Sequence, residues 1–242
     1  MSRALRWLGT VAAALLLVVV VFVAWTQTVF QGERDAALDA WRDEGITITS
    51  TSGAVLMEPA DGGSGTGLVF VPGAKVDPYA YLRVLSGVVD AGATVVITKP
   101  TLNLAFFDPR GLDAFTGLAP GVDDWWVGGH SLGGVRACLM AGEAGADATG
   151  LVLFGSYCAN DLSDSGLEVL SISGSNDGLT TPDDVTGNAH LLPDDATFVE
   201  LEGANHAAFG DYGVQPGDGE ATMPREASLA AITDALTEAL AP

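Results

Sequence analysis

Residues 125–135 read Trp-Trp-Val-Gly-Gly-His-Ser-Leu-Gly-Gly-Val and contain the pattern G-x-S-x-G centred on Ser131. A hydrophobic run typical of a buried strand stops at this pattern, and helix-like sequence follows it. A sharp strand-to-helix turn of this kind exposes the serine hydroxyl, and its flanking positions must be small because strand and helix approach closely. Because the chain has 31 glycines, the pattern alone can arise by chance. The sequence around it therefore determines how strongly it indicates such a turn.

Apolar runs and helical patterns alternate on both sides of this turn. Strands are predicted at 46–50, 54–58, 68–71, 94–97, 125–127, 150–154, 169–172 and 197–201, and helices at 78–90, 132–143, 181–189 and 224–240. This alternation predicts the α/β class, with a mostly parallel sheet covered by helices on both faces and preceded by an antiparallel hairpin. In such sheets ligands bind at the carboxyl ends of the strands.

The overall charge excludes one class of partner. The 242 residues include 31 acidic and 10 basic side chains, a net charge of -21, so the surface repels phosphates and we expect no nucleic-acid partner. The two cysteines, Cys138 and Cys158, allow one disulfide in an exported domain, although two buried thiols are the default expectation. No C-x-x-C pattern or His/Cys cluster is present, so we expect no metal and no cofactor.

The N-terminal segment has the features of a membrane anchor. Arg3 and Arg6 precede an uncharged stretch bounded by Trp7 and Trp25, whose length approaches the thickness of the hydrocarbon core. A cleaved signal would have a shorter apolar region and a better cleavage site, so an uncleaved anchor is favoured and secretion is the alternative. The arginines predict a cytoplasmic N-terminus, and therefore a single-pass protein of the cell membrane with an extracytoplasmic catalytic domain.

These patterns divide the chain into three parts. Residues 1–30 form the anchor or signal segment, and residues 31–45 form a linker or short polar helix that serves as a spacer. Residues 46–242 form one catalytic domain.

A serine hydroxyl needs a base, most often a histidine, to act as a nucleophile at neutral pH. Of the three histidines, His130 lies inside the turn and is expected to pack against the domain, whereas His190 is expected at the surface. His206 follows the last predicted strand and therefore lies at a carboxyl end. It is the only histidine in the right place for a base.

The histidine in turn needs a carboxylate to orient it. Asp177 follows the strand at 169–172 and lies on a turn at the same edge of the sheet, whereas Asp161 and Asp164 are less favoured substitutes. The chain order is then serine, aspartate, histidine, as in the α/β-hydrolase arrangement.

The motifs together resemble the α/β-hydrolase superfamily. They are the turn at 129–133, the Gly-Ser-Asn-Asp sequence at 174–177 and the segment Asn-His-Ala-Ala-Phe-Gly-Asp-Tyr-Gly at 205–213. From residue 68 onward the chain is similar to a small lid-less branch, described as carboxymethylenebutenolidase-like or simply as α/β-hydrolases. The resemblance implies the α/β-hydrolase fold, with Ser131 as nucleophile, His206 as base and Asp177 as acid.

One residue departs from this branch. Dienelactone hydrolases use a cysteine nucleophile, whereas this chain has a serine, so a carboxylesterase-like activity is the expectation. The predicted oxyanion hole combines the amide of Leu132 with an amide after the strand at 68–71. Pro72 has no N–H, so Ala74 is the predicted second donor and Lys75 the alternative.

Four residues are predicted to bind substrate. Lys75 and Lys99 are the only lysines, and each follows a predicted strand, so they are expected to bind an anionic or carbonyl-rich group or, alternatively, to hold loops by pairing with aspartates. Asn103 and Tyr79 are expected to line an open, partly apolar cleft. Little sequence remains for a lid, which favours small or protruding acyl groups over long buried lipids.

The sequence therefore predicts a serine hydrolase that cleaves a carboxylic ester or related acyl bond of a small-molecule substrate through an acyl-enzyme on Ser131. Two alternatives remain. The first is a membrane-tethered binding protein on an idle hydrolase fold. The second is a peptidase or acyltransferase with the same three residues.

Overall fold

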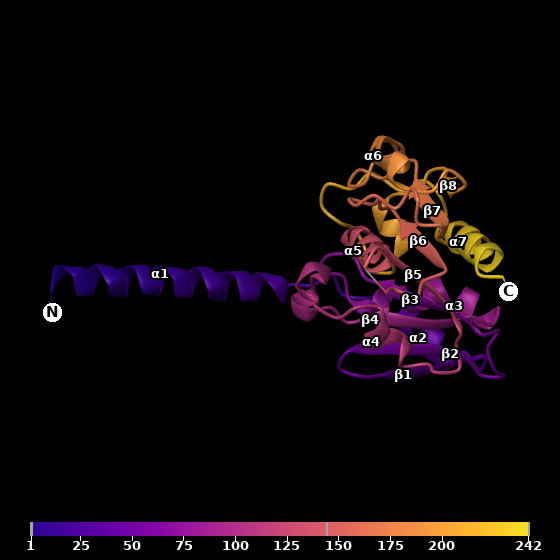
Figure 1. Cartoon of the computed structure of the whole chain (residues 1–242), viewed down its shortest axis with the longest axis horizontal. Coiled ribbons are helices and arrows are strands. Elements are labelled where there is room, and N and C mark those ends of the chain that lie inside the picture. Colours follow the sequence, from indigo (N-terminus) through magenta and orange to yellow (C-terminus); the bar gives the residue numbers. More distant parts are fainter. Residues whose placement is uncertain (1, 144, 242) are drawn as a thin grey trace.

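The computed structural model of the protein describes residues 2–143 and 145–241, and it combines a long N-terminal helix with a sheet domain (Figure 1). The strands are β1 (Ile46–Ser50), β2 (Ala54–Pro59), β3 (Thr66–Val71), β4 (Thr94–Thr98), β5 (Asp124–His130), β6 (Gly150–Phe154), β7 (Glu168–Gly174) and β8 (Thr197–Leu201). The α-helices are α1 (Arg3–Thr26), α2 (Arg34–Arg42), α3 (Leu82–Asp90), α4 (Asp113–Thr116), α5 (Leu132–Ala141), α6 (Pro182–Asn188) and α7 (Arg225–Ala239). Short 3₁₀ helices are η1 (Pro78–Tyr81), η2 (Thr101–Asn103), η3 (Ala105–Phe107), η4 (Ala189–Leu191) and η5 (His206–Phe209).

The strands form one sheet in the order β1-β2-β4-β3-β5-β6-β7-β8. The pairs β1–β2 and β2–β4 are antiparallel, and all the other pairs are parallel, as the sequence predicted. The parallel strands end at Val71, Thr98, His130, Phe154, Gly174 and Leu201. These ends define the carboxyl edge of the sheet, and the starts of the same strands define its amino edge.

Strand β3 shows how the sheet separates two cores. Leu68 and Phe70 pack into the core that contains side chains of α3 and α7, whereas Val69 and Val71 enter the core that contains α5. Because successive side chains of a strand point to opposite faces, a strand that is apolar throughout requires cover on both faces. The helices provide this cover, which fixes where each strand ends.

Helix α2 is the short helix that was one of the two expectations for residues 31–45, but it packs against the domain instead of serving as a spacer. Ala36 and Ala40 are buried, and α2 packs against α3. These alanines are four residues apart and lie on one face of the helix, so a mostly polar segment still buries a narrow apolar strip. Composition alone underestimated this contact.

Helix α1 projects from the domain on the side opposite to the end of α7 (Figure 1). Its 24 residues are long and apolar enough to cross a membrane, which is compatible with an anchor or a signal sequence. At 1.5 Å per residue the helix is about 36 Å long.

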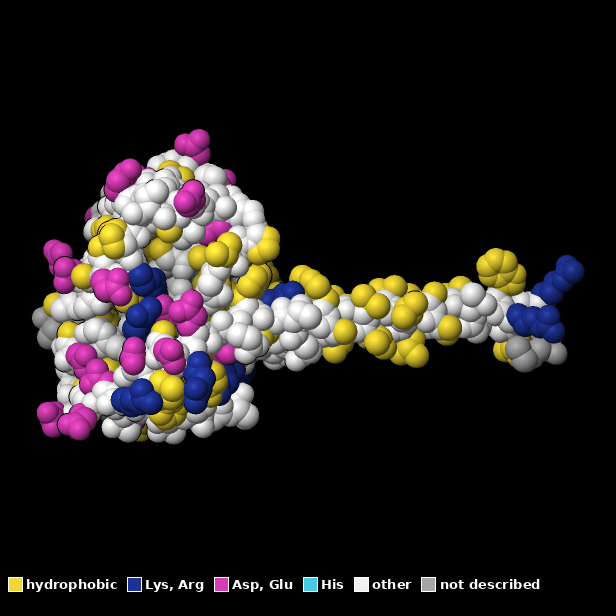
Figure 2. Space-filling view, turned by 180° about the vertical axis from the view of Figure 1, so that it is seen from behind, with side chains coloured by type: hydrophobic (Ala, Val, Ile, Leu, Met, Phe, Trp, Pro, Cys, Tyr) yellow, Lys and Arg dark blue, Asp and Glu magenta, His cyan; other side chains and the backbone are white. Residues whose placement is uncertain are grey.

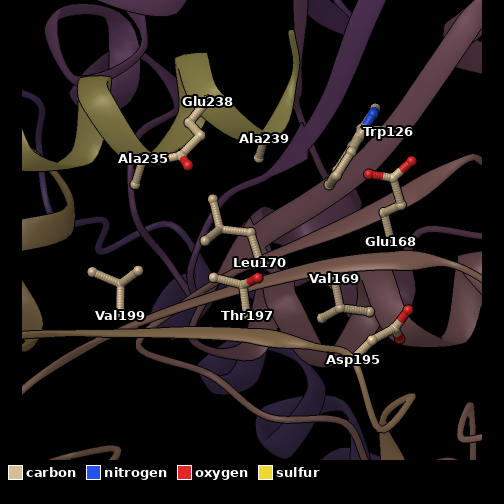
Figure 3. A pocket seen from close by; sticks show the side chains of 10 residues that line it. All are labelled: Trp126, Glu168, Val169, Leu170, Asp195, Thr197, Val199, Ala235, Glu238 and Ala239. Atoms are coloured by element: carbon tan, nitrogen blue, oxygen red, sulfur yellow. The ribbon is translucent and has the colours of Figure 1, made fainter.

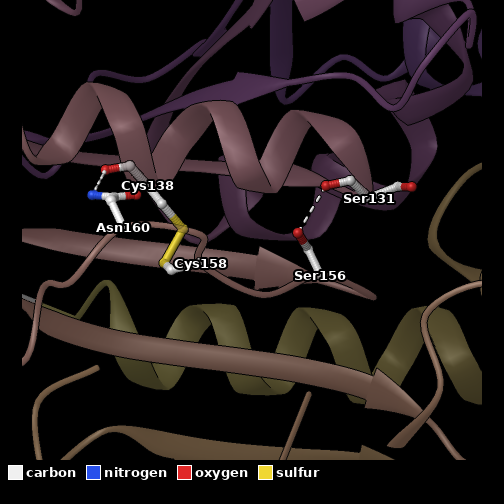
Figure 4. The surroundings of a disulfide bond; sticks show 5 residues. All are labelled: Ser131, Cys138, Ser156, Cys158 and Asn160. Carbon is white, nitrogen blue, oxygen red and sulfur yellow. Dashed lines mark hydrogen bonds between the residues drawn. A yellow bond between two sulfur atoms is a disulfide. The ribbon is translucent and has the colours of Figure 1, made fainter. Parts of the chain in front are cut away.

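A disulfide joins Cys138 of α5 to Cys158, which follows β6 (Figure 4). The default expectation of two buried thiols was therefore wrong. The Cα atoms lie 5.5 Å apart, within the usual range for a disulfide, because α5 runs alongside the segment that leaves β6.

Candidate active site

Ser131 lies on a strained turn between β5 and α5. Its φ is +54° and its ψ is -126°, a region that residues with a Cβ atom rarely adopt. A Cβ atom on Gly129 would lie 2.6 Å from the carbonyl oxygen of Val71, and one on Gly133 would collide with the same oxygen. Both flanking positions therefore have to be glycine, which is the reason that the G-x-S-x-G pattern predicted the turn.

Two hydrogen bonds hold the backbone of this turn. The Ser131 amide donates to the Phe154 carbonyl at 3.0 Å, and the Ser156 hydroxyl donates to the Ser131 carbonyl at 2.7 Å. The Ser131 hydroxyl points away from Ser156 and from the body of α5 (Figure 4). The strained residue is therefore fixed while its reactive atom remains free.

His206 and Asp177 form a buried pair at the carboxyl edge. The His206 Nδ1–H donates to Asp177 Oδ2 at 2.7 Å, and the side chains are 1% and 0% exposed. The other oxygen, Oδ1, accepts hydrogen bonds from the amides of Leu179 at 2.8 Å and Thr180 at 2.7 Å. These hydrogen bonds hold the carboxylate in place, and the carboxylate in turn fixes the orientation of the imidazole.

The pair is not hydrogen-bonded to Ser131. The described residues give the buried Nε2 of His206 no hydrogen-bond partner, and no hydrogen bond of the Ser131 hydroxyl is formed. Catalytic hydrogen bonds are often long in unliganded enzymes and tighten when substrate binds. The structure thus brings His206 and Asp177 together at the edge that carries Ser131. The hydrogen bond from the Ser131 hydroxyl to His206 Nε2 is not formed.

Asp218 holds the backbone of His206 from a direction that the sequence did not indicate. Its carboxylate accepts the amides of His206 at 3.0 Å and of Ala207 at 2.9 Å. These bonds hold the start of η5 against the loop 215–219. Asp218 lies between two glycines of an acid-rich chain, so no sequence signal distinguishes it from an ordinary turn residue.

His130 packs inside the domain, as predicted. The Tyr81 hydroxyl accepts the Gly73 amide at 2.9 Å and pairs with His130 Nδ1 at 2.9 Å, and the His130 and His206 ring centroids are 4.4 Å apart. Burial lowers the pKa of His130 well below its ordinary value, and a charge on His206 lowers it further. His130 is therefore a neutral ring against which the proposed base packs.

The predicted oxyanion donors lie on both sides of the turn. Leu132 begins α5, and Ala74 lies in the loop after β3; within residues 2–143 and 145–241 neither amide has an acceptor. The Lys75 amide, the alternative donor, instead bonds to the Asn103 carbonyl at 2.8 Å. Of the two possibilities, Ala74 is the one that leaves a free N–H.

The predicted substrate-binding residues have partners in the protein itself. Lys75 Nζ donates to the Thr28 hydroxyl at 2.9 Å and lies 4.1 Å from the centre of the Trp25 ring, and Asn103 Nδ2 donates to the Thr26 carbonyl at 3.0 Å. These two side chains hold the end of α1, and their part in substrate binding stays a prediction.

Lys99, which follows β4, is also held by hydrogen bonds to the protein. Its Nζ donates to the Ser50 hydroxyl and the Thr51 carbonyl, each at 2.7 Å, and to the Tyr79 hydroxyl at 3.2 Å. Lys99 and Tyr79 also line an open hollow of about 510 Å³. Both lysines hold loops, but through hydroxyls and carbonyls rather than through the aspartates that the alternative expected.

The remaining candidates lie elsewhere. His190 is exposed and its Nδ1 contacts the Gly187 carbonyl at 3.0 Å, and Asp161 accepts hydrogen bonds from Ser163. Asp177, rather than Asp161, is the carboxylate that the fold places on His206.

A hollow of about 320 Å³ lies at the amino edge and is not part of this site. Glu168 and Thr197 begin β7 and β8, and Ala239 ends α7, and all three line it. Figure 3 shows Glu168, Asp195 and Glu238 around it. Because ligands of open α/β sheets bind at the carboxyl ends, its position argues against a catalytic role.

The sequence of residues 67–230 matches the family described as "Alpha/beta hydrolase family". The chain belongs to this family. The match spans the strand-to-helix turn at 129–133 (the nucleophile elbow of this family), both partners of the buried pair and most of the sheet, so this protein is an α/β hydrolase. No protein with a curated description matches the chain in sequence.

Three solved structures share the fold of this α/β hydrolase. MGS-MChE2, an alpha/beta hydrolase enzyme from the metagenome of lagoon sediments of Mar Chica, Morocco, is 19% identical with a TM-score of 0.51, covering 67% of this chain and 90% of that one. TT1662 from Thermus thermophilus is 14% identical with a TM-score of 0.57, covering 81% and 99%. A membrane phospholipase A, described as a bacterial virulence factor, is 18% identical with a TM-score of 0.52, covering 96% and 97%.

Proposed function

We propose that this hydrolase cleaves a carboxylic ester or related acyl bond through an acyl-enzyme on Ser131. The observation that carries the proposal is the buried hydrogen bond between His206 Nδ1 and Asp177 Oδ2. It leaves Nε2, at the edge of the Ser131 turn, without a hydrogen-bond partner among the residues that the structure describes. An imidazole whose Nδ1–H is held by a carboxylate presents a basic Nε2, which is the atom that a serine hydroxyl requires.

In the first half of the reaction, Ser131 Oγ attacks the carbonyl carbon of the ester while His206 Nε2 takes its proton. The amides of Leu132 and Ala74 donate to the oxyanion of the tetrahedral intermediate. Loss of one such donor typically costs about 3 kcal/mol of transition-state stabilisation. The intermediate collapses, and the leaving alcohol takes the proton from His206.

In the second half, water attacks the acyl-enzyme and His206 again serves as base. The second intermediate collapses to the carboxylic acid and free Ser131. Asp177 keeps its charge throughout and stabilises the imidazolium that forms in each half.

We place the catalytic domain outside the cytoplasm, with α1 as an uncleaved anchor. Arg3 and Arg6 precede α1, which favours a cytoplasmic N-terminus. The disulfide is typical of oxidising compartments. The membrane phospholipase A of similar fold supports an anchored arrangement. A secreted form, cleaved after α1, is the alternative.

Two other functions use the same framework. A non-catalytic binding protein would need the fold but not the chemistry, and a peptidase or acyltransferase would share the acyl-enzyme and differ in substrate or acceptor. The Nε2 of His206 and the amides of Leu132 and Ala74 have no hydrogen-bond partner in the described part of the chain, which favours an enzyme, since a binding protein gains nothing from them.

Hydrolysis of soluble p-nitrophenyl esters by the full-length protein tests the proposal. We expect Ser131→Ala to lower kcat/KM by at least about a thousandfold. Ser165→Ala, at an exposed loop serine, is the matched control and keeps the wild-type rate. Equal activity of Ser131→Ala and wild type would contradict the proposal.

A further inference from the structure

The anchor leaves the domain beside the candidate site. The segment after α1 crosses the carboxyl edge: the Phe30 amide bonds to the Lys75 carbonyl at 2.7 Å, the Asp77 amide bonds to the Phe30 carbonyl at 2.9 Å, and the Glu33 amide bonds to the Asp211 carbonyl at 2.7 Å. These partners lie in the loops after β3 and β8. The chain between α1 and α2 is thus fixed to the edge that carries Ser131.

The end of α1 is held on the domain by side-chain contacts as well as by the continuous chain. Thr26 is fully buried, and its carbonyl accepts a hydrogen bond from Asn103 Nδ2. Lys75 contacts both Trp25 and Thr28. Lys75 follows Ala74, so the loop that carries the proposed oxyanion donor is tied directly to the end of the anchor.

Two exposed aromatic side chains indicate how deep this edge would lie in a bilayer that α1 spans. Phe106 and Phe107 of η3 are 53% and 50% exposed, and the Phe107 ring lies 5.7 Å from the ring of Phe22 in α1. Phe22 lies within the uncharged part of α1, three residues or about 4.5 Å before Trp25. When α1 spans a bilayer with Trp25 at the interface, Phe107 lies at the depth of the acyl chains.

The same edge has further apolar and basic side chains suited to an interface. Leu179 follows β7 and Val214 follows β8, and both are exposed, Val214 by 89%. Lys75 beside Trp25 is a pair typical of the headgroup region. Figure 2 shows hydrophobic side chains on the part of the domain next to α1, whereas most projecting acidic side chains lie on the side away from it.

We propose that α1 holds the carboxyl edge against the bilayer and that the hydrolase acts on lipid esters in the leaflet from which α1 emerges. The substrate class rests on the proposed serine hydrolase function, whereas the docking of Phe106 and Phe107 does not. The lack of sequence for a lid fits this arrangement, because the bilayer itself covers the site. The ester carbonyl protrudes at the interface while the acyl chain stays largely in lipid.

The docking is tested with the full-length protein in vesicles of phosphatidylcholine and phosphatidylglycerol. Phe107→Cys, labelled with an environment-sensitive NBD fluorophore, reports the depth of η3, and the disulfide leaves no native thiol to label. Phe198→Cys is the matched control, because Phe198 is 46% exposed near the start of β8, toward the amino edge. We expect blue-shifted emission and quenching by doxyl lipids at position 107 only. Solvent-like emission at both positions would overturn the docking.

The substrate class is tested on the same vesicles by release of fatty acid, with a soluble p-nitrophenyl ester measured in parallel. The double variant Phe106→Ser with Phe107→Ser is expected to hydrolyse vesicle lipid about tenfold more slowly and the soluble ester at nearly the wild-type rate. Phe198→Ser is expected to change neither rate.

The outcomes separate the two proposals. Turnover of the soluble ester without release of fatty acid would overturn the lipid substrate and leave the hydrolase intact. An equal loss in the Phe106/Phe107 and Phe198 variants would also overturn it. Failure of the wild type on both esters would contradict the proposed function, and the fluorescence at position 107 would still decide the docking.

Discussion

The two edges of the sheet differ in what they contain. The amino edge has a hollow of about 320 Å³ lined by Glu168, Asp195 and Glu238, all of them side chains with access to solvent. The carboxyl edge has the strained Ser131, the buried His206–Asp177 pair and the end of α1. Both edges have a hollow, and the one lined by Lys99 and Tyr79 beside the carboxyl edge is the larger at about 510 Å³. Fixed orientation and burial of the polar groups distinguish the carboxyl edge.

The direction of the strands accounts for this difference between the edges. Parallel strands deliver their loops to one edge, so residues distant in sequence meet there. A carboxylate at the amino edge remains hydrated, whereas Asp177 accepts three hydrogen bonds away from water. The following predictions test whether the two edges differ as described.

The largest effect is expected from exchanging one carboxylate for an amide at each edge. Asp177→Asn should lower kcat/KM on soluble esters by about 10³- to 10⁴-fold, because the amide no longer selects the tautomer with a basic Nε2. Asp195→Asn, at the amino edge, should leave kcat/KM unchanged. Similar losses in both variants would erase the distinction between the edges.

The next effect concerns the covalent tie between α5 and the segment after β6. Replacing Cys138 and Cys158 by Ala should lower the free energy of unfolding by about 3 kcal/mol, as expected for a loop of this length. Urea unfolding measures this, and a reductant should destabilise the wild type but not the double variant. A double variant as stable as wild type would show that the elbow helix does not depend on the tie.

The smallest effect is a pH dependence of stability. Because burial lowers the pKa of His130 in the folded protein, the unfolded chain binds a proton below about pH 6.5 that the folded protein does not bind. Stability should therefore fall by up to about 1.4 kcal/mol per pH unit as the pH decreases below this value.

Two variants isolate this contribution in urea unfolding between pH 5 and 7. His130→Gln should flatten the pH dependence by one proton, whereas His190→Gln, at an exposed position before β8, should keep the wild-type slope. Equal slopes in wild type and His130→Gln would mean that His130 is not a buried neutral ring.

The sequence predicted the sheet well because its strands are short apolar runs between glycines and prolines. The helix predicted at 132–143 is α5, which follows the turn as expected. The glycines of that turn are required because a Cβ atom would clash with β3, and the sequence pattern shows this requirement. The spacer prediction for 31–45 failed, because the burial of Ala36 and Ala40 depends on the helix that faces them. The disulfide could not be predicted for the same reason, because it depends on the packing of α5 beside the segment that follows β6.

The candidate site was predictable where the topology determines it. His206 and Asp177 follow strands, so their meeting at one edge could be expected from strand order alone. Asp218 and the contacts of Lys75 with the end of α1 could not be expected, because they depend on loop paths that no periodicity encodes. Membership of the small lid-less, carboxymethylenebutenolidase-like branch stays a prediction.

Covalent labelling tests the central claim most directly. The full-length protein is treated with a fluorophosphonate, digested and mapped by peptide mass spectrometry. We expect a single adduct on Ser131, which is lost when the probe competes with an ester that the enzyme turns over. An adduct on a different residue, or ester turnover with Ser131 left unmodified, would contradict it.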